Sequence, residues 1–125
     1  MGRIRARFKD KMELNSYTKG LWAEFFAAVY FCLKGYRPLS CRFKTPVGEI
    51  DLIAKRGNTL VFIEVKMRQN AAAAGEAINA KNQSRVRRAA ELYLQRYPEY
   101  NNCVMRFDAL LLAPYVMPQH IKNAF

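Results

Sequence analysis

Apolar and polar residues alternate with two different periods along the chain, and each period predicts one kind of element. From Thr18 onward, apolar residues recur at helical spacing, and Gly35 is placed to end this first helix. Strand-like alternation follows in YRPLSCRFK and again on both sides of a turn at residues 57–58. The predicted apolar face of the first helix consists of Leu21, Phe25, Ala28, Val29 and Cys32.

The second half of the chain changes from helix to strand once more. A helical pattern runs from Ala77 to Tyr97 and ends before Pro98, and a strand follows in NCVMRFDALLLAP. The last segment, VMPQHIKNAF, is expected to form a final strand or turn. The order helix, three strands, helix, strand predicts one α/β domain over residues 18–125, with a mixed β-sheet flanked by helices. Residues 1–17 are expected to form a basic N-terminal arm. The predicted buried face of the second helix consists of Val86, Ala90, Tyr93, Leu94 and Tyr97.

The two strands around residues 57–58 carry charges among their apolar positions. A hairpin closed by this turn pairs residues that are equidistant from it, which places Asp51 opposite Glu64 and Glu49 opposite Lys66. Because strand side chains alternate, all four charges are predicted on one side of the sheet. The other side is predicted to hold Ile50, Leu52, Ala54, Val61, Ile63 and Val65.

Two carboxylates that face each other repel, and the repulsion grows when water is excluded. Lys66 supplies one compensating charge, and a divalent cation would supply two more. An oxygen-only ligand set without Cys or His favours a hard cation, Mg²⁺ or Mn²⁺. Such a cation can polarise a phosphate and lower the pKa of a bound water, while a lysine orients that water. An ordinary solvent-facing strand with Glu–Lys pairs remains the alternative at this point.

The overall charge favours a polyanionic partner. The chain has 21 Lys and Arg against 10 Asp and Glu, a net charge of +11, so nucleic acid is expected as the partner in preference to an anionic membrane. A solvated basic surface is the remaining alternative. No apolar run approaches the roughly 18 residues that span a bilayer. The residues expected to hold phosphates are Arg68, Lys81, Arg85 and Arg88, together with Arg3, Arg5 and Arg7 of the arm.

Cysteine and histidine are too sparse for several other chemistries. The three cysteines lie far apart, and His120 is the only histidine, which argues against a zinc site, a disulfide framework or a histidine-based triad. Unpaired cysteines are typical of a reduced compartment, so a cytoplasmic protein is expected.

With these residues identified, the sequence resembles known nucleases. Asp51, twelve intervening residues and then EVK at 64–66 resemble the PD-(D/E)xK signature of the restriction-endonuclease-like superfamily, although position 50 is Ile in place of Pro. The segments GEIDLIA, VFIEVKMR, RAAELYL, RFDALLL and HIKNAF resemble the YraN-like family of small bacterial proteins, which are usually described as candidate endonucleases. The resemblance extends from about Gly20 to Phe125.

The resemblance implies a restriction-endonuclease-like core of order αβββαβ and a role for each acidic residue. Asp51 and Glu64 would be metal ligands, and Lys66 the catalytic lysine. Glu49 would be an auxiliary ligand or would support the ligands without touching the metal, since the superfamily gives this position no fixed role. Glu24 would be a further acidic ligand on the first helix, as in some junction resolvases. The implied cofactor is Mg²⁺ or Mn²⁺.

Three functions remain open from sequence. The favoured one is a metal-dependent nuclease that hydrolyses phosphodiester bonds. DNA is favoured over RNA as its substrate, and a branched or damaged DNA is considered. Cleavage of both strands would favour a homodimer. The second is a non-catalytic nucleic-acid-binding module on the same fold. The third is an interaction protein whose basic surface meets a partner protein or a membrane.

Overall fold

A computed structural model describes residues 21–68 and 80–125, without the side chains of residues 80–82. The predicted arm over 1–17 and the start of the second predicted helix lie outside the described residues, and so does the side chain of Lys81. Among the described residues, no helix combines the length and the apolar character needed to cross a membrane.

The described chain forms an α/β fold with a mixed sheet. Residues 21–33 are helical. The remaining elements are β1 (Arg37–Thr45), β2 (Gly48–Arg56), β3 (Thr59–Met67), α3 (Ala80–Arg96), the 3₁₀ helix η1 (Pro98–Tyr100), β4 (Val104–Leu112) and β5 (Gln119–Ile121). The sheet order is β1-β2-β3-β4-β5, in which β3 and β4 run parallel and the other neighbours antiparallel. The predicted fold class and element order are confirmed, with β5 as the final strand, and they are consistent with a restriction-endonuclease-like core.

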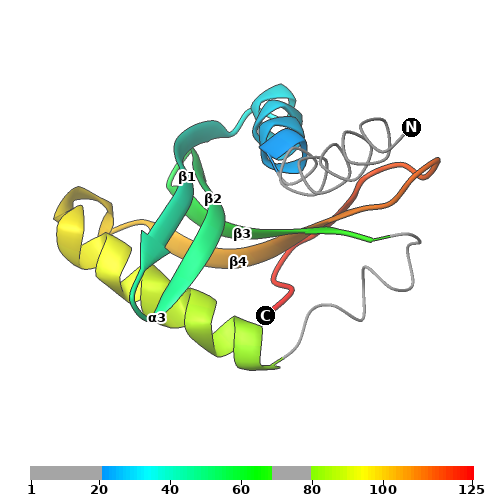
Figure 1. Cartoon of the computed structure of the whole chain (residues 1–125). Helices are drawn as coiled ribbons and strands as arrows, with labels where there is room; N and C mark the ends of the chain where they lie inside the picture. Colours follow the sequence, from blue (N-terminus) through cyan, green and yellow to red (C-terminus); the bar gives the residue numbers. More distant parts are fainter. Residues whose placement is uncertain (1–20, 69–79) are drawn as a thin grey trace, which may run out of the picture.

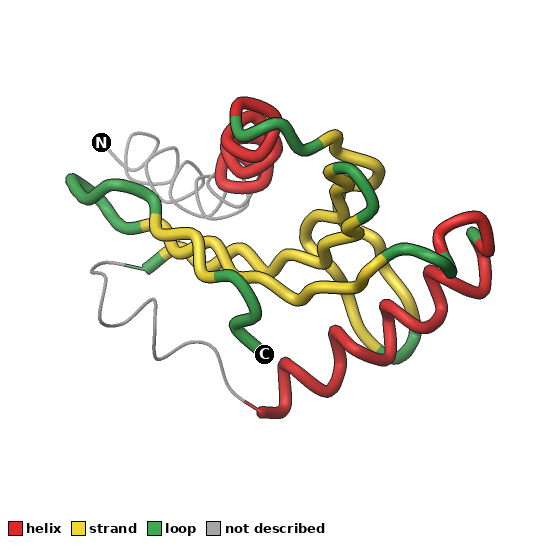
Figure 2. The backbone as a smooth tube through the Cα atoms, turned by 180° about the vertical axis from the view of Figure 1, so that it is seen from behind, coloured by secondary structure: helices red, strands yellow, loops and turns green. Residues whose placement is uncertain are grey.

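Helices cover the two faces of the sheet and create two apolar cores (Figures 1 and 2). Helical residues 21–33 pack on one face against Leu52, Ile63 and Leu110. Helix α3 packs on the other face, where it covers a cluster that includes Phe62. The parallel pair of β3 and β4 lies between the helices, buried on both sides, which explains the long apolar runs of these two strands.

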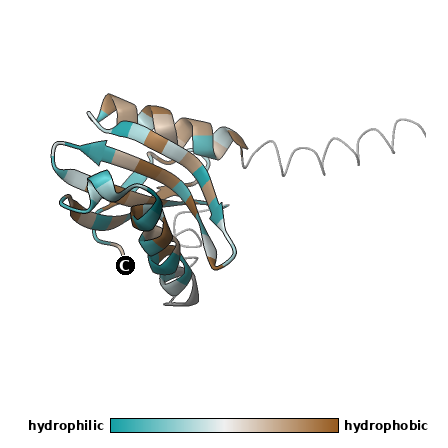
Figure 3. Cartoon of the chain, turned by 90° about the vertical axis from the view of Figure 1, so that its left-hand side faces the viewer, coloured by the Kyte–Doolittle hydropathy of each residue, from teal (hydrophilic) through white to brown (hydrophobic). Residues whose placement is uncertain are grey.

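The first helix buries a different face from the one predicted. Ala23, Ala27 and Phe31 are buried against the sheet. Of the predicted face, only Ala28 is partly buried. The exposed members of that face are Leu21, Phe25, Val29 and Cys32. The prediction was wrong because this helix is apolar on nearly all sides (Figure 3), so spacing alone could not select its buried face. The two alanines let the helix backbone lie close to the sheet.

Helix α3 follows the predicted pattern more closely. Val86, Ala90 and Tyr93 are buried as expected, and Ala89 joins them. Tyr97 is 38% exposed and lies beyond the helix end, so its predicted place in the buried face was wrong. The chain leaves the α-helix there because Pro98, which cannot donate a backbone hydrogen bond, begins η1 instead.

A buried polar cluster anchors the C-terminal segment to β4. Asp108 is fully buried and accepts bonds from Arg106 and from the backbone N–H of Asn123, at 2.9 and 3.1 Å. His120 Nε2 lies 2.7 Å from the same carboxylate, and Arg106 also donates to the Tyr36 hydroxyl. A buried carboxylate needs partners of this kind. The segments RFDALLL and HIKNAF therefore contribute to the fold at this cluster.

Candidate metal and nucleic-acid site

The site forms where β2 separates from β3. The predicted hairpin register is confirmed from Leu52, paired with Ile63, down to the turn, where Gly57 has φ +58°. Beyond Leu52, β2 bends away (Figure 1), and Asp51 no longer has a backbone partner across the gap. Its carboxylate Oδ2 instead accepts a 2.8 Å bond from the backbone N–H of Val65. The carboxylate thereby takes the place of the missing backbone bond between β2 and β3, and it lies in the opening between these two strands.

The pairing of β1 with β2 is interrupted at the same level. Arg42 and Asp51 face each other without pairing, and Arg42 has φ +55°, a left-handed conformation that costs a non-glycine residue roughly 1–3 kcal/mol. The strand faces change here: Leu52 packs towards residues 21–33, whereas Ile50 packs towards α3. The prediction that Ile50 and Leu52 share a face was wrong, because strict alternation does not survive this distortion.

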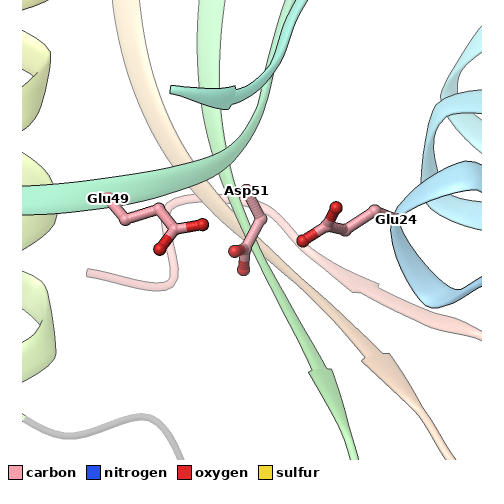
Figure 4. Close-up of side chains that lie close together, drawn as sticks. All are labelled: Glu24, Glu49 and Asp51. Atoms are coloured by element: carbon pink, nitrogen blue, oxygen red, sulfur yellow. The ribbon is translucent and has the colours of Figure 1, made fainter. Parts of the chain in front are cut away.

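Three carboxylates meet at the distorted position. Glu24 from the first helix, and Glu49 and Asp51 from β2, each place one oxygen within 4.8 Å of the others. Figure 4 shows the side chains of Glu24 and Glu49 reaching towards Asp51 from opposite sides. The separation is short enough for one cation to contact all three, since carboxylate ligands lie about 2.0–2.6 Å from Mg²⁺ or Ca²⁺.

Glu64 brings a fourth carboxylate to the same opening, outside that close group. Its side chain is only 9% exposed, and Oε1 lies 2.9 Å from Lys66 Nζ. The other oxygen, Oε2, is buried with no hydrogen-bond partner among the described residues. A buried, unsatisfied carboxylate oxygen is costly, and a directly bound cation would satisfy it. The donor set is therefore suited to an oxygen-preferring divalent cation.

The electrostatics of the cluster also favour a cation. Burial is the main cause that raises the pKa of Asp51 to about 6; the charges of Glu64, Glu24 and Glu49 act in the same direction, and the bond from the Val65 amide opposes them. Burial likewise raises the pKa of Glu24, against the lowering effect of Arg42. Because Asp51 and Glu24 both resist ionisation in this setting, a bound divalent ion would stabilise their charged forms.

A cleft of about 760 Å³ joins these groups to helix α3. All four charged residues that the hairpin pattern singled out line it, namely Glu49, Asp51, Glu64 and Lys66. Arg85 and Arg88 line it from α3. The volume is in the range of small-ligand sites, so a phosphate with its neighbouring sugar can enter.

Glycine at position 48 allows α3 to lie this close. A Cβ added to Gly48 would fall 2.5 Å from the backbone oxygen of Arg85, closer than real Cβ contacts permit. The turn before it is held by Thr45, whose hydroxyl accepts bonds from the N–H groups of Val47 and Gly48 and donates to the Gly48 oxygen. Tight packing at this point sets the distance between Arg88, one turn further along α3, and the carboxylates.

The other predicted phosphate contacts lie elsewhere. Arg68 follows β3, is exposed and donates to the Met67 carbonyl, and it is not among the described residues that line the cleft. Arg42, which contacts Glu24, was not among the predicted site residues. A signal was present, because residues equidistant from the Pro46–Val47 turn include Arg42 and Asp51.

Comparison with known proteins places the chain in a family. The profile of the uncharacterised protein family UPF0102 matches residues 23–112. This chain belongs to the UPF0102 family. A UPF0102 protein of Nitrobacter winogradskyi is 44% identical over 114 residues, which are 91% of this chain and 97% of that protein. A UPF0102 protein of Methylorubrum extorquens is 46% identical over 110 residues, covering 88% of this chain and 86% of its own.

The YraN-like resemblance is confirmed by these matches. The matched residues 23–112 of the UPF0102 chain include every member of the carboxylate cluster, together with Lys66, Arg85 and Arg88. The names of the relatives state no activity, so the function has to be argued from the chemistry of the cleft.

Proposed function

We propose that this UPF0102 protein is a metal-dependent nuclease that hydrolyses phosphodiester bonds of nucleic acid, with DNA favoured over RNA. The observation that carries the proposal is Glu64 Oε2, a buried carboxylate oxygen that has no hydrogen-bond partner within the described part of the chain, in one cleft with Asp51 and Lys66. A protein that only needed a stable sheet would gain nothing from this arrangement, because each of its charges is costly to bury.

The carboxylates supply the ligands for the cofactor in this proposal. Asp51 and Glu64 would hold Mg²⁺ or Mn²⁺, with Glu49 and Glu24 as further oxygen donors. When bound, the cation would supply Lewis-acid stabilisation of the negative charge that develops on the phosphate.

Lys66 would assist the hydrolysis itself. The oxygen of water forms a bond to phosphorus and the water gives up one proton, one ester P–O bond breaks, and the leaving oxygen takes up one proton. Lys66 Nζ lies 2.9 Å from Glu64 Oε1, so an ammonium with three donors would lie beside a phosphate bound at the carboxylates. From there it can orient the water and stabilise negative charge in the transition state.

Arg85 and Arg88 would hold the nucleic-acid backbone across the cleft. Both side chains are exposed on α3 and face the carboxylates, and the whole chain carries a net charge of +11. Contacts of guanidinium groups with phosphates give affinity and position but carry little sequence information. The proposal therefore favours recognition of backbone shape, such as a branched or damaged DNA, in a reduced cytoplasmic setting.

A cleavage assay tests the proposal. Supercoiled plasmid and a synthetic four-way junction are incubated with Mg²⁺ or Mn²⁺ and with wild type, Asp51→Asn, Glu64→Gln or Lys66→Met. We expect cleavage by the wild type, abolished by EDTA, and a loss of roughly 100-fold or more in each variant, because the groups act together. Glu91→Gln, which removes an exposed carboxylate of α3, is the matched control and should cleave normally.

Two results would count against the proposal. Cleavage that persists in all three site variants would come from a contaminating nuclease. Salt-sensitive binding without cleavage of any substrate, unchanged in Asp51→Asn, would favour the non-catalytic binding module instead.

A further inference from the structure

Arg42 occupies the position that a cation would take beside two of the cluster carboxylates. Its Nε lies 2.9 Å from Glu24 Oε2 and 4.0 Å from Glu49 Oε1. The residue faces Asp51 across the β1–β2 pair. One guanidinium therefore stands beside two of the three carboxylates that would hold a metal ion.

The backbone indicates that this placement has a purpose beyond packing. Arg42 adopts φ +55°, an unfavourable conformation for a residue with a Cβ, and one that glycine or asparagine would adopt more readily. Strained residues cluster at functional sites, where the surrounding structure keeps them in place. From this position the cationic side chain reaches Glu24, on the helix of residues 21–33 that packs against Leu52 of β2.

A guanidinium and a divalent cation would compete for these carboxylates. Both need the oxygens of Glu24 and Glu49, and two cations held so close together repel each other. The side chain of Arg42 is 30% exposed although its Nε is buried, so the residue reaches both the cluster and the solvent. Once displaced, it would add a positive charge next to a cleft already lined by Arg85 and Arg88.

We infer that Arg42 is an internal counter-ion of the metal site, which holds Glu24 and Glu49 until a divalent cation binds and then turns to a phosphate of the nucleic acid. The inference rests on the proposed metal site. It predicts that cation and nucleic acid bind cooperatively, because the cation releases the arginine that the phosphate then engages. Thermodynamic linkage requires the reverse effect to be of equal size.

Metal binding to the protein alone provides the first test. Mn²⁺ affinity is measured by electron paramagnetic resonance for wild type, Arg42→Asn, Arg42→Lys and Arg37→Gln. Asparagine suits the left-handed backbone, so Arg42→Asn should fold while lacking the competing charge. We expect it to bind Mn²⁺ on the order of tenfold more tightly than wild type. Arg42→Lys keeps the charge, and Arg37→Gln removes an exposed arginine of the same strand; both should remain near wild type.

The second test measures the cooperativity. Fluorescence anisotropy of a labelled DNA duplex is followed with and without Ca²⁺, which prefers the same oxygen ligands. Ca²⁺ should tighten DNA binding several-fold in wild type and Arg37→Gln, and clearly less in Arg42→Asn.

The outcomes separate this inference from the proposed nuclease. Mn²⁺ affinity that is unchanged or weaker in Arg42→Asn, with normal binding by wild type, would overturn the role of Arg42 and leave the metal site intact. An equal effect of Ca²⁺ on DNA binding in wild type and Arg42→Asn would also overturn it. Absence of Mn²⁺ binding in wild type and in every variant would overturn the metal site, and the inference with it.

Discussion

At the scale of single residues, the charged side chains of the hairpin could be found from sequence because they contradict their surroundings. Glu64 and Lys66 stand in a strand whose other residues after Thr59 are apolar, and a sheet that needs only stability has no use for these charges. The role of Arg42 was harder to predict, because an arginine in a strand with polar positions is unremarkable in sequence. Its importance depends on a left-handed backbone and on Glu24, which comes from a distant helix.

Asp51 leads to a prediction about stability in the protein without metal. Its pKa of about 6 in the folded protein lies above the ordinary value of 3.8, so the folded state holds the proton more tightly than the unfolded chain. The resulting contribution to the free energy of unfolding is present below about pH 4 and is lost as the pH rises through about 6. Asp51→Asn should therefore be more stable than wild type at pH 7, by roughly 1–3 kcal/mol.

Urea unfolding in EDTA at pH 4 and pH 7 measures this difference. The two proteins should converge at pH 4, where the aspartate is protonated, and added Mn²⁺ should stabilise only the wild type at pH 7. Glu91→Gln controls for the loss of a carboxylate at an exposed position. If Asp51→Asn is less stable than wild type at pH 7, the ionised Asp51 carboxylate does not destabilise the metal-free protein, and the prediction is wrong.

At the scale of elements, sequence reasoning was reliable close to turns and unreliable where strands bend. The turn at residues 57–58 sets the register of β2 and β3 as far as Leu52. Between Gly48 and Asp51, β2 contacts β1 and α3 and no longer pairs with β3. The geometry of the turn at residues 57–58 does not predict where β2 and β3 separate. The first helix illustrates the same limit, because its apolar residues surround it and only contact with the sheet selects Ala27 and Phe31 for burial.

The contact between β2 and α3 can be tested through Gly48. Gly48→Ala places a methyl group 2.5 Å from a backbone oxygen of α3, which cannot move without the helix. We expect destabilisation of roughly 1–3 kcal/mol from overpacking, and weaker nucleic-acid binding because Arg85 and Arg88 move away from the carboxylates. Thermal unfolding and anisotropy with labelled DNA measure the two effects.

Gly57→Ala is the matched control for this substitution. Gly57, unlike Gly48, has a positive φ of +58°, but a Cβ there would meet nothing within 4 Å. It should lose about 1 kcal/mol of stability through backbone strain and keep its DNA affinity. Equal losses of DNA affinity in the two variants would show that the close approach at Gly48 does not position the arginines.

At the scale of the whole molecule, the order of helices and strands was predictable because helical and strand-like spacings of apolar residues distinguish the two kinds of element. The family resemblance then predicted how these elements are arranged in a mixed sheet. The pattern of apolar and polar residues could not predict the cleft. The cleft depends on the separation of β2 from β3 and on the close approach of α3 to the start of β2 at Gly48. The site therefore brings together residues from the first helix, two strands and α3. No local stretch of sequence contains all of them.

The net charge of +11 leads to the last prediction, which concerns where that charge acts. If phosphates are bound across the cleft, each lost contact should reduce the slope of log affinity against log salt by about 0.9 for duplex DNA. Arg85→Gln and Arg88→Gln should each show this change together with weaker binding. Arg87→Gln removes an equal charge from α3, but its guanidinium lies 4.5 Å from the Phe107 ring and outside the lining of the cleft, so its slope should match wild type. Equal slopes for all three variants would mean that the positive charge acts as a diffuse field, and that nucleic acid is not held beside the carboxylates.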